Sequence, residues 1–320
     1  MDIFSHALLS FILGQALQLD RDLQLILMVS SIILDIDAIS IRSQEAAFRS
    51  HRGPLHSILA ALLTSAPISA GYIIFMRLPP TAFLSVIPVC LAGLFSHLFL
   101  DLLTTGNMKV LWPFSRRNFA FNLAVFIDPT FFGTLLVAAF LIISTKTDAS
   151  GIQIVAVAAI ACITLNLGVR YYEKNTAIKI IKGLDACVAS EIVSLPTLRP
   201  NKWWTIRKTP FENGYKYEIG EVDCIRNKIL SKSNVESPYV DFNGPAELPI
   251  DSPQKAVACS KRDKRIGTSI VKLVIPAVIV TPLDHGKTWQ VLWYDIINYT
   301  NRREPRGILV RVRADGTVTA

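Results

Sequence analysis

The chain has 320 residues, 51% of them hydrophobic, with a formal net charge of +8 and an isoelectric point near 9.3. This length allows about two domains, and a mean hydropathy of +0.40 argues against a wholly soluble protein. Basic proteins often bind nucleic acid. Here, however, Lys and Arg lie largely beside apolar runs, so we expect membrane lipids as partners and no nucleic acid.

Six apolar stretches occupy the first part of the chain. They are Ile3–Leu19, Leu23–Ile41, Pro54–Arg77, Ala82–Leu103, Ile127–Ser144 and Ile152–Tyr172. A membrane helix needs about 20 residues, so the later stretches suffice, whereas the short first one could be tilted or re-entrant. We predict an α-helical multi-pass membrane domain over residues 1–172, with about five or six membrane helices.

The pattern changes after Tyr172. A basic amphipathic segment, Lys174–Lys182, could lie along the membrane surface, and residues 173–195 are assigned to a linker. Short β-like runs then alternate with turn signals: Asn201–Lys208, Tyr215–Ile225, Thr268–Val280, Thr288–Tyr294 and Gly307–Val312. They predict a small antiparallel sheet in a β-rich soluble domain, residues 196–320.

The charged loops indicate which side faces the cytoplasm. In this topology one side carries Arg42, Arg49, Arg52, Lys109, Arg116, Arg117, Arg170 and Lys174, and the other carries Arg21, Arg77 and Lys146. Because basic residues favour the cytoplasmic side, the first side and the soluble domain are predicted to be cytoplasmic at the inner membrane. The cysteines are odd in number and form no CxxC pair, which argues against a disulfide framework and a thiolate metal site.

Histidines and aspartates gather at the predicted cytoplasmic ends of the apolar stretches. They are His6, Asp35, Asp37, His51, His56, His97 and Asp101. The sidedness was derived from Lys and Arg alone, so the convergence of these residues on one face is an independent indication of a metal site. Imidazole and carboxylate would be its ligands.

The segment SHLFLDLLTTG places His97 four residues before Asp101. On a helix these two side chains share a face, roughly 6 Å apart at Cβ, which is the spacing by which a helix offers two ligands to one metal. A buried His–Asp pair that only locks two helices together is an equal alternative.

The segment HRGPLHS surrounds a predicted helix start. Gly53 suits the cap and Pro54 the first turn, which leaves His56 in that turn and His51 in the preceding loop. A helix N-terminus favours neutral imidazole and attracts anions, and Arg52 could clamp a phosphate or carboxylate. The alternative is a basic loop that touches lipid headgroups.

Asp35 and Asp37 in ILDIDAIS are two residues apart. If the helix ends there, both can turn toward the site, one as a ligand and the other as a partner of a ligand imidazole. They could also only mark the membrane boundary. Asp128 is a candidate supporting carboxylate or a helix cap, and His285 is assigned to a surface turn.

The order of these motifs resembles the YdjM-like family of LexA-regulated, membrane-bound metal-dependent hydrolases. The resemblance covers roughly the first 130 residues and rests on His6, Asp35–Asp37, His51–Ser57, His97–Gly106 and Trp112-Pro113-Phe114. Leu34 stands where the family often has proline. The resemblance implies a multi-pass inner-membrane protein with hydrolase activity, and it names no substrate.

We therefore expect a metal-dependent hydrolase at the cytoplasmic membrane surface. One or two divalent ions, with zinc favoured over manganese or iron, would be held by His6, Asp37, His51, His56, His97 and Asp101. Asp35 would orient water or a ligand imidazole, and Arg52 would stabilise charge on a phosphoryl or acyl group. A phosphoester of a lipid headgroup is the most economical substrate class, because the site opens at the lipid–water boundary.

Two other functions fit the same residues. The first is a non-catalytic, membrane-anchored binding or regulatory protein with a structural metal, in which Trp203, Trp204, Trp289 and Trp293 of the β-rich half bind a protein partner. The second is a transporter, which the position of the polar groups at one face disfavours, since secondary transporters bind near the midplane.

Overall fold

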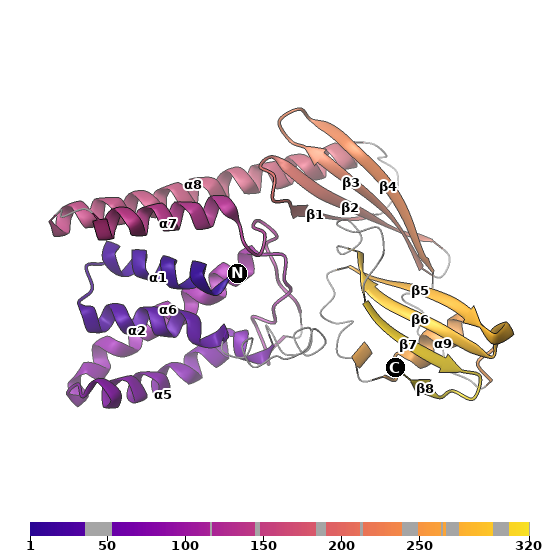
Figure 1. The fold of residues 1–320 in the computed structure, drawn as a ribbon, viewed down its shortest axis with the longest axis horizontal. Helices are drawn as coiled ribbons and strands as arrows, with labels where there is room; N and C mark the ends of the chain where they lie inside the picture. Colours follow the sequence, from indigo (N-terminus) through magenta and orange to yellow (C-terminus); the bar gives the residue numbers. More distant parts are fainter. Residues whose placement is uncertain are drawn as a thin grey trace. The chain divides into compact units, whose positions relative to one another are not determined.

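The structure is a computed structural model. It describes residues 1–35, 53–115, 117–144, 148–183, 190–211, 214–238, 249–263, 265–266, 275–296 and 307–319. The chain forms two compact units, Met1–Tyr172 with Pro196–Leu198, and Glu173–Leu195 with Arg199–Ala320. Figure 1 shows that the first is helical and the second is built largely of strands, as predicted.

Helices of the first unit follow the apolar stretches closely. They are α1 (Ile3–Ala16), α2 (Arg21–Ile32), α5 (Ile58–Met76), α6 (Phe83–Leu103), α7 (Pro129–Ser144) and the first part of α8 (Ala149–Lys182), as far as Tyr172. Three 3-10 turns also belong to this unit: η1 (Ile33–Asp35), η2 (Pro54–His56) and η3 (Pro80–Ala82). Side-chain caps fix several of the starts. Asp20 accepts a hydrogen bond from the Leu23 amide at 2.9 Å, and Ser57 accepts one from the Ala60 amide at 3.1 Å, as is usual at helix N-termini.

Three helices of the described chain are long and apolar enough to cross a membrane: Ile58–Met76, Pro80–Leu103 (which includes η3) and Ala149–Lys182. Ile3–Ala16 and Pro129–Ser144 are apolar but shorter. The number of membrane spans, predicted as about five or six, therefore stays a prediction.

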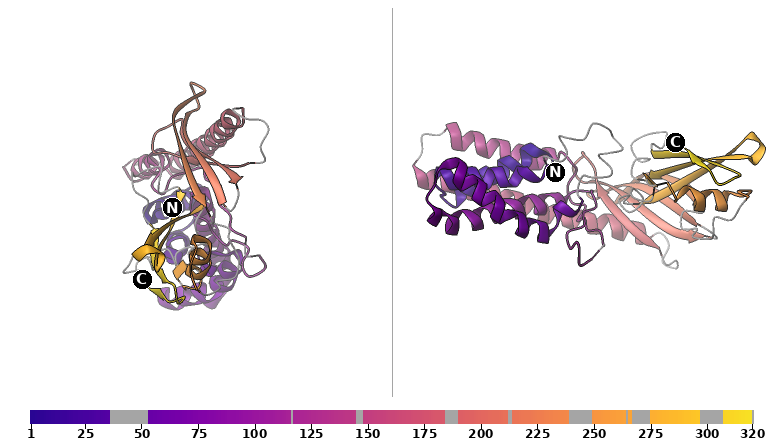
Figure 2. Two further views of the ribbon diagram at one scale, coloured as in Figure 1. Left: turned by 90° about the vertical axis from the view of Figure 1, so that its right-hand side faces the viewer. Right: turned by 90° about the horizontal axis from the view of Figure 1, so that it is seen from below.

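The helices α2 and α6 pack closely at Gly93. A Cβ atom added there would lie 2.5 Å from the backbone oxygen of Leu27, so only glycine fits without a shift of the backbone. Figures 1 and 2 show α1, α2, α5 and α6 running alongside one another. Close approach of this kind is typical of helix packing in membranes, where small residues lie at the contacts.

The basic segment Lys174–Lys182, assigned from the sequence to an amphipathic linker, continues α8 without a break. Within the second unit this end of the helix packs on a sheet, since Trp203 Nε1 donates to Glu173 Oε2 at 3.2 Å and Arg207 contacts the Ile181 carbonyl oxygen. These contacts with the sheet stabilise the end of the helix.

The second unit contains two four-stranded antiparallel sheets where the sequence predicted one. The first has the order β1 (Glu191–Pro196), β2 (Lys202–Phe211), β3 (Gly214–Asp223), β4 (Lys228–Pro238). The second has the order β5 (Pro276–Leu283), β6 (Thr288–Asp295), β7 (Gly307–Arg313), β8 (Val318–Thr319), and α9 (Pro253–Ser260) packs against it. Ser237 links β4 to β5, because its hydroxyl accepts from the Val278 amide at 2.6 Å and donates to the Val278 carbonyl at 3.0 Å.

Tryptophans of this unit are core residues. Trp203 is 0% exposed, Trp293 2% and Trp289 7%. The indole of Trp293 donates to Ser260 Oγ at 3.0 Å, and that of Trp289 donates to the Ile250 carbonyl at 3.2 Å. Burial and satisfied N–H groups therefore leave these three side chains little surface for the partner contact that the alternative function assigned to them. Trp204 is only partly buried.

Candidate metal centre

The pair His97–Asp101 lies on one face of α6, as its spacing predicts. Both side chains are fully buried, and His97 Nε2 lies 3.7 Å from Asp101 Oδ2. The helix ends two residues later, at Leu103, so the pair occupies its last turns. The Thr104 hydroxyl donates to the Asp101 carbonyl at 2.9 Å and closes this end of the helix.

The second ring nitrogen of His97 fixes the ring. His97 Nδ1 lies 2.7 Å from the carbonyl oxygen of Ser31 at the end of α2. A carbonyl oxygen can only accept, so Nδ1 carries the proton and Nε2 keeps a lone pair. Among the described residues Nε2 has no hydrogen-bond partner. A backbone contact that orients a ligand imidazole in this way is the usual arrangement around metal-binding histidines.

Two 3-10 turns supply further side chains. η1 ends on Asp35, whose Oδ1 lies 3.7 Å from His97 Nε2. η2 ends on His56, whose Nε2 lies 3.9 Å from Asp101 Oδ2. The helix that was expected to begin at Pro54 begins instead at Ile58, with Ser57 as its cap, and the Ile58 amide donates to the Val110 carbonyl at 3.0 Å. The short turn therefore directs His56 inward before the long helix starts.

His6 comes from the first turns of α1. Its Nε2 lies 3.6 Å from Asp101 Oδ1 and 3.8 Å from Asp35 Oδ2, and its ring stacks on that of His97. The amino group of Met1 also contacts Asp101 Oδ1. Asp2 caps α1 by accepting from the Ser5 amide at 2.9 Å. This cap fixes the start of the helix that carries His6.

The arrangement fits a divalent metal ion. Asp35, His56, His97 and Asp101 are all buried, and each offers a ligand atom within 4.8 Å of the others. Burying two carboxylates and several imidazoles costs free energy unless a partner compensates their charge and polarity. Imidazole and carboxylate ligands suit zinc and also manganese or iron, so the donor set leaves the identity of the metal open.

The sequence-predicted residues divide into two groups. His6, Asp35, His56, His97 and Asp101 come together. Asp35, assigned to orienting water or an imidazole, lies among the ligand atoms themselves. Asp37, His51 and Arg52 lie outside the described residues, so their roles stay predictions.

Asp128 has a structural role. It caps α7 through the Thr130 and Phe131 amides at 3.1 and 3.2 Å, and its Oδ2 accepts from Arg170 at 2.8 Å. Of the two roles predicted for it, these contacts match the helix cap.

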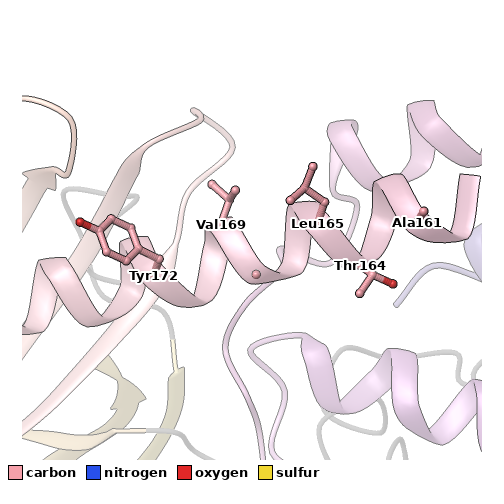
Figure 3. Close-up of a pocket in the computed structure, with 6 residues that line it drawn as sticks. Ala161, Thr164, Leu165, Val169 and Tyr172 are labelled. Carbon is pink, nitrogen blue, oxygen red and sulfur yellow. The ribbon is translucent and has the colours of Figure 1, made fainter. Parts of the chain in front are cut away.

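A shallow apolar groove of about 720 Å³ lies on α8 and is separate from the cluster. It is lined by Ala161, Thr164, Leu165, Gly168, Val169 and Tyr172. Figure 3 shows Leu165 and Val169 projecting from the same side of the helix. None of these residues belongs to the cluster.

Comparison with models of known protein families shows to which family the chain belongs. A family model described as YdjM inner membrane protein matches residues 1–177. The chain belongs to this family. No curated protein and no solved structure matches it. The match confirms the resemblance drawn from the motifs. The matched residues include α1, α2, α5, α6, α7 and the part of α8 up to residue 177.

Two contacts of this YdjM centre could not be found from the sequence. The Ser31 carbonyl and the Met1 amino group are main-chain groups, and no side-chain motif encodes them. Adjacent Ser30 and Ser31 in an otherwise apolar stretch were the available signal, because small polar residues often lie where membrane helices touch.

Proposed function

We propose that this YdjM family member is a multi-pass inner-membrane hydrolase that depends on a divalent metal. The observation that carries the proposal is the convergence of Asp35, His56, His97 and Asp101 from separate elements into one buried group. Such a set is costly to bury without a cation. The basic loops favour a cytoplasmic position for this end of the helices and for the β-rich unit.

The residues of the site would have different roles in hydrolysis. His56, His97 and Asp101 would hold the ion, which when bound would lower the pKa of water toward about 7 and polarise a phosphoryl or acyl oxygen. Asp35 has the most exposed side chain of the described cluster, at 7% against 0% for the others. It would therefore be the ligand beside which water approaches the ion, and its carboxylate would also orient that water. Arg52 would bind the anionic part of the substrate.

The substrate class follows from the position of the site. The ligands lie at the ends of apolar helices, so the headgroup of a membrane lipid could reach them without leaving the interface. A phosphoester of such a headgroup would meet both the metal and a cationic side chain, which is the usual recognition of phosphoryl groups. We propose this class as the substrate.

Burial favours a second candidate, a structural metal site in a binding or regulatory protein. A structural site is closed by protein ligands, whereas a catalytic site keeps one position open. Four of the five described ligand side chains are fully buried, as a closed site requires. Helices α2, α5 and α6 would then be held together by the ion.

Metal analysis with hydrolysis assays separates the two candidates. The detergent-purified full chain would be stripped with EDTA, reloaded with zinc or manganese, and assayed with bis(p-nitrophenyl) phosphate and with phosphatidic acid in mixed micelles. We expect stoichiometric metal and metal-dependent hydrolysis, both lost in His97→Ala and kept in His285→Ala. Metal without hydrolysis of either substrate would support the structural role, and a chain that binds no metal would overturn both.

A further inference from the structure

The ligand atoms of the cluster divide into two sets around its carboxylates. Oδ1 of Asp101 lies 3.6 Å from His6 Nε2, whereas Oδ2 lies 3.7 Å from His97 Nε2 and 3.9 Å from His56 Nε2. Asp35 repeats the division, with Oδ2 at 3.8 Å from His6 Nε2 and Oδ1 at 3.7 Å from His97 Nε2. Each carboxylate thus offers one oxygen to His6 and the other to His97.

The imidazoles of His6 and His97 cannot serve a single ion. Their rings are stacked, with centroids 3.9 Å apart and planes inclined by only 16°, and both Nε2 atoms face the same two carboxylates. A metal lies in the plane of the ring that binds it, at about 2.0–2.1 Å for zinc. Two nearly parallel planes separated in this way do not meet within that distance.

His56 and His97 have the opposite relation. Their centroids are 5.2 Å apart and their planes are inclined by 55°, so their lone pairs can converge on one point. Together with Asp35 and Asp101 they form the compact group of four ligands. His6 is outside that group, although it is buried and neither of its ring nitrogens has a hydrogen-bond partner among the described residues.

We infer that the centre holds two divalent ions bridged by Asp35 and Asp101. His56 and His97 complete the first position, and His6 is the histidine of the second. The inference rests on the proposed function in that both require metal binding. The 3.9 Å ring separation matches the metal spacing of about 3.5–4 Å in two-metal sites, which are common in enzymes that cleave phosphoesters.

The charges of the pocket bear on how many cations it binds. Two buried carboxylates face three imidazoles, and the Met1 amino group contacts Asp101 Oδ1, the oxygen assigned to the His6 side. That ammonium already supplies one positive charge at this oxygen. An ammonium that permanently neutralises Asp101 would leave room for one ion only, so the number of ions bound is the quantity to measure.

The test is a manganese titration of the full chain in detergent after removal of metal with EDTA. Bound Mn²⁺ would be counted by elemental analysis and observed by electron paramagnetic resonance, in which two carboxylate-bridged ions couple and broaden the six-line spectrum of an isolated ion. We expect two ions per chain and a coupled spectrum. Neither readout depends on turnover.

The decisive variant is His6→Phe, which keeps a flat ring stacked on His97 and removes the ligand atoms. It should bind one ion per chain and give an uncoupled spectrum. His285→Ala, in an exposed turn of the second unit, is the matched control and should keep two. If His6→Phe unfolds, as judged by gel filtration and circular dichroism, His6→Ala replaces it.

The outcomes separate this inference from the proposed function. One ion per chain in both the parent and His6→Phe overturns the two-ion centre and leaves metal-dependent hydrolysis standing. One ion in the parent and none in His6→Phe also overturns it, because His6 would then bind a single shared ion. Two ions in His6→Phe show that His6 is not a ligand. No metal in the parent overturns both proposals.

Discussion

His97 donates a hydrogen bond from Nδ1 to the carbonyl oxygen of Ser31, over 2.7 Å. This contact joins the last turns of α6 to the end of α2 and aims Nε2 at the carboxylates. Such hydrogen bonds determine which ring nitrogen of a neutral histidine carries the proton. We therefore expect His97 to be the Nδ1–H tautomer in the metal-free protein. Two-dimensional ¹H–¹⁵N spectra that correlate ring nitrogens with ring protons would identify it, with His97→Ala for assignment. An Nε2–H ring at His97 would contradict the orientation described.

Gly93→Ala should destabilise the first unit. The added Cβ would lie 2.5 Å from the Leu27 backbone oxygen, so α2 and α6 must separate, and overpacking of this kind typically costs about 1–3 kcal/mol. Since Asp35 lies in η1 directly after α2, and His97 lies on α6, metal affinity should fall as well. Thermal unfolding in detergent and a zinc titration would measure both effects.

Gly71→Ala is the matched control, because a Cβ at Gly71 of α5 would meet nothing within 4 Å. It should leave the melting temperature unchanged or raise it, as replacement of a helical glycine usually does. Equal effects at Gly71 and Gly93 would show that close packing of α2 against α6 does not hold the site.

Arg170→Met should be among the most destabilising single changes in the first unit. Arg170 and Asp128 form a buried ion pair at 2.8 Å, with side chains 6% and 2% exposed. Removal of one partner leaves the other charge uncompensated, which typically lowers the free energy of unfolding by about 3–5 kcal/mol. The double variant Asp128→Asn, Arg170→Met should recover most of the loss, because Asn keeps an oxygen to cap α7. Melting temperatures of the parent, single and double variants would decide it, and a double variant no more stable than Arg170→Met would refute the charge explanation.

Cys224 should be a slow nucleophile at neutral pH. Burial, together with the nearby carboxylates of Glu173 and Asp223, raises its pKa from 9.0 to about 12. The thiolate is the reactive form, so deprotonation in the folded chain is delayed to higher pH. In a variant with the other four cysteines replaced by serine, alkylation by iodoacetamide should keep accelerating from pH 9 to pH 11. In urea the rate should be half-maximal near the unshifted pKa of 9.0 and level off about one pH unit above it. A folded chain that did the same would contradict the shift.

The helical part of the fold could be predicted because hydropathy reports it directly. The stretch Ala82–Leu103 predicted α6, which spans Phe83–Leu103. Strand β4 was missed because its sequence, KILSKSNVESP, is mostly polar and shows little alternation. It pairs along its length with β3, and tertiary pairing of this kind overrides intrinsic preference.

The site could be predicted only in part, for a similar reason. The spacing of His97 and Asp101 on one helix is local, so the sequence contains it. The approach of His6 to the same carboxylates depends on how α1 packs, and no local pattern encodes that. The start of α5 was misplaced because Pro54 is equally suited to an α-helix and to the 3-10 turn that it actually opens.

Four of the five tryptophans lie in the second unit, so the two units contribute unequally to the intrinsic fluorescence. Trp203, Trp289 and Trp293 are buried in the second unit, Trp204 is partly buried there, and Trp112, 39% exposed, belongs to the first. Intrinsic emission from this protein is therefore dominated by the β-rich unit. A metal-induced change in the helical unit would be nearly silent in fluorescence, while the melting of the sheets would be reported without any added label.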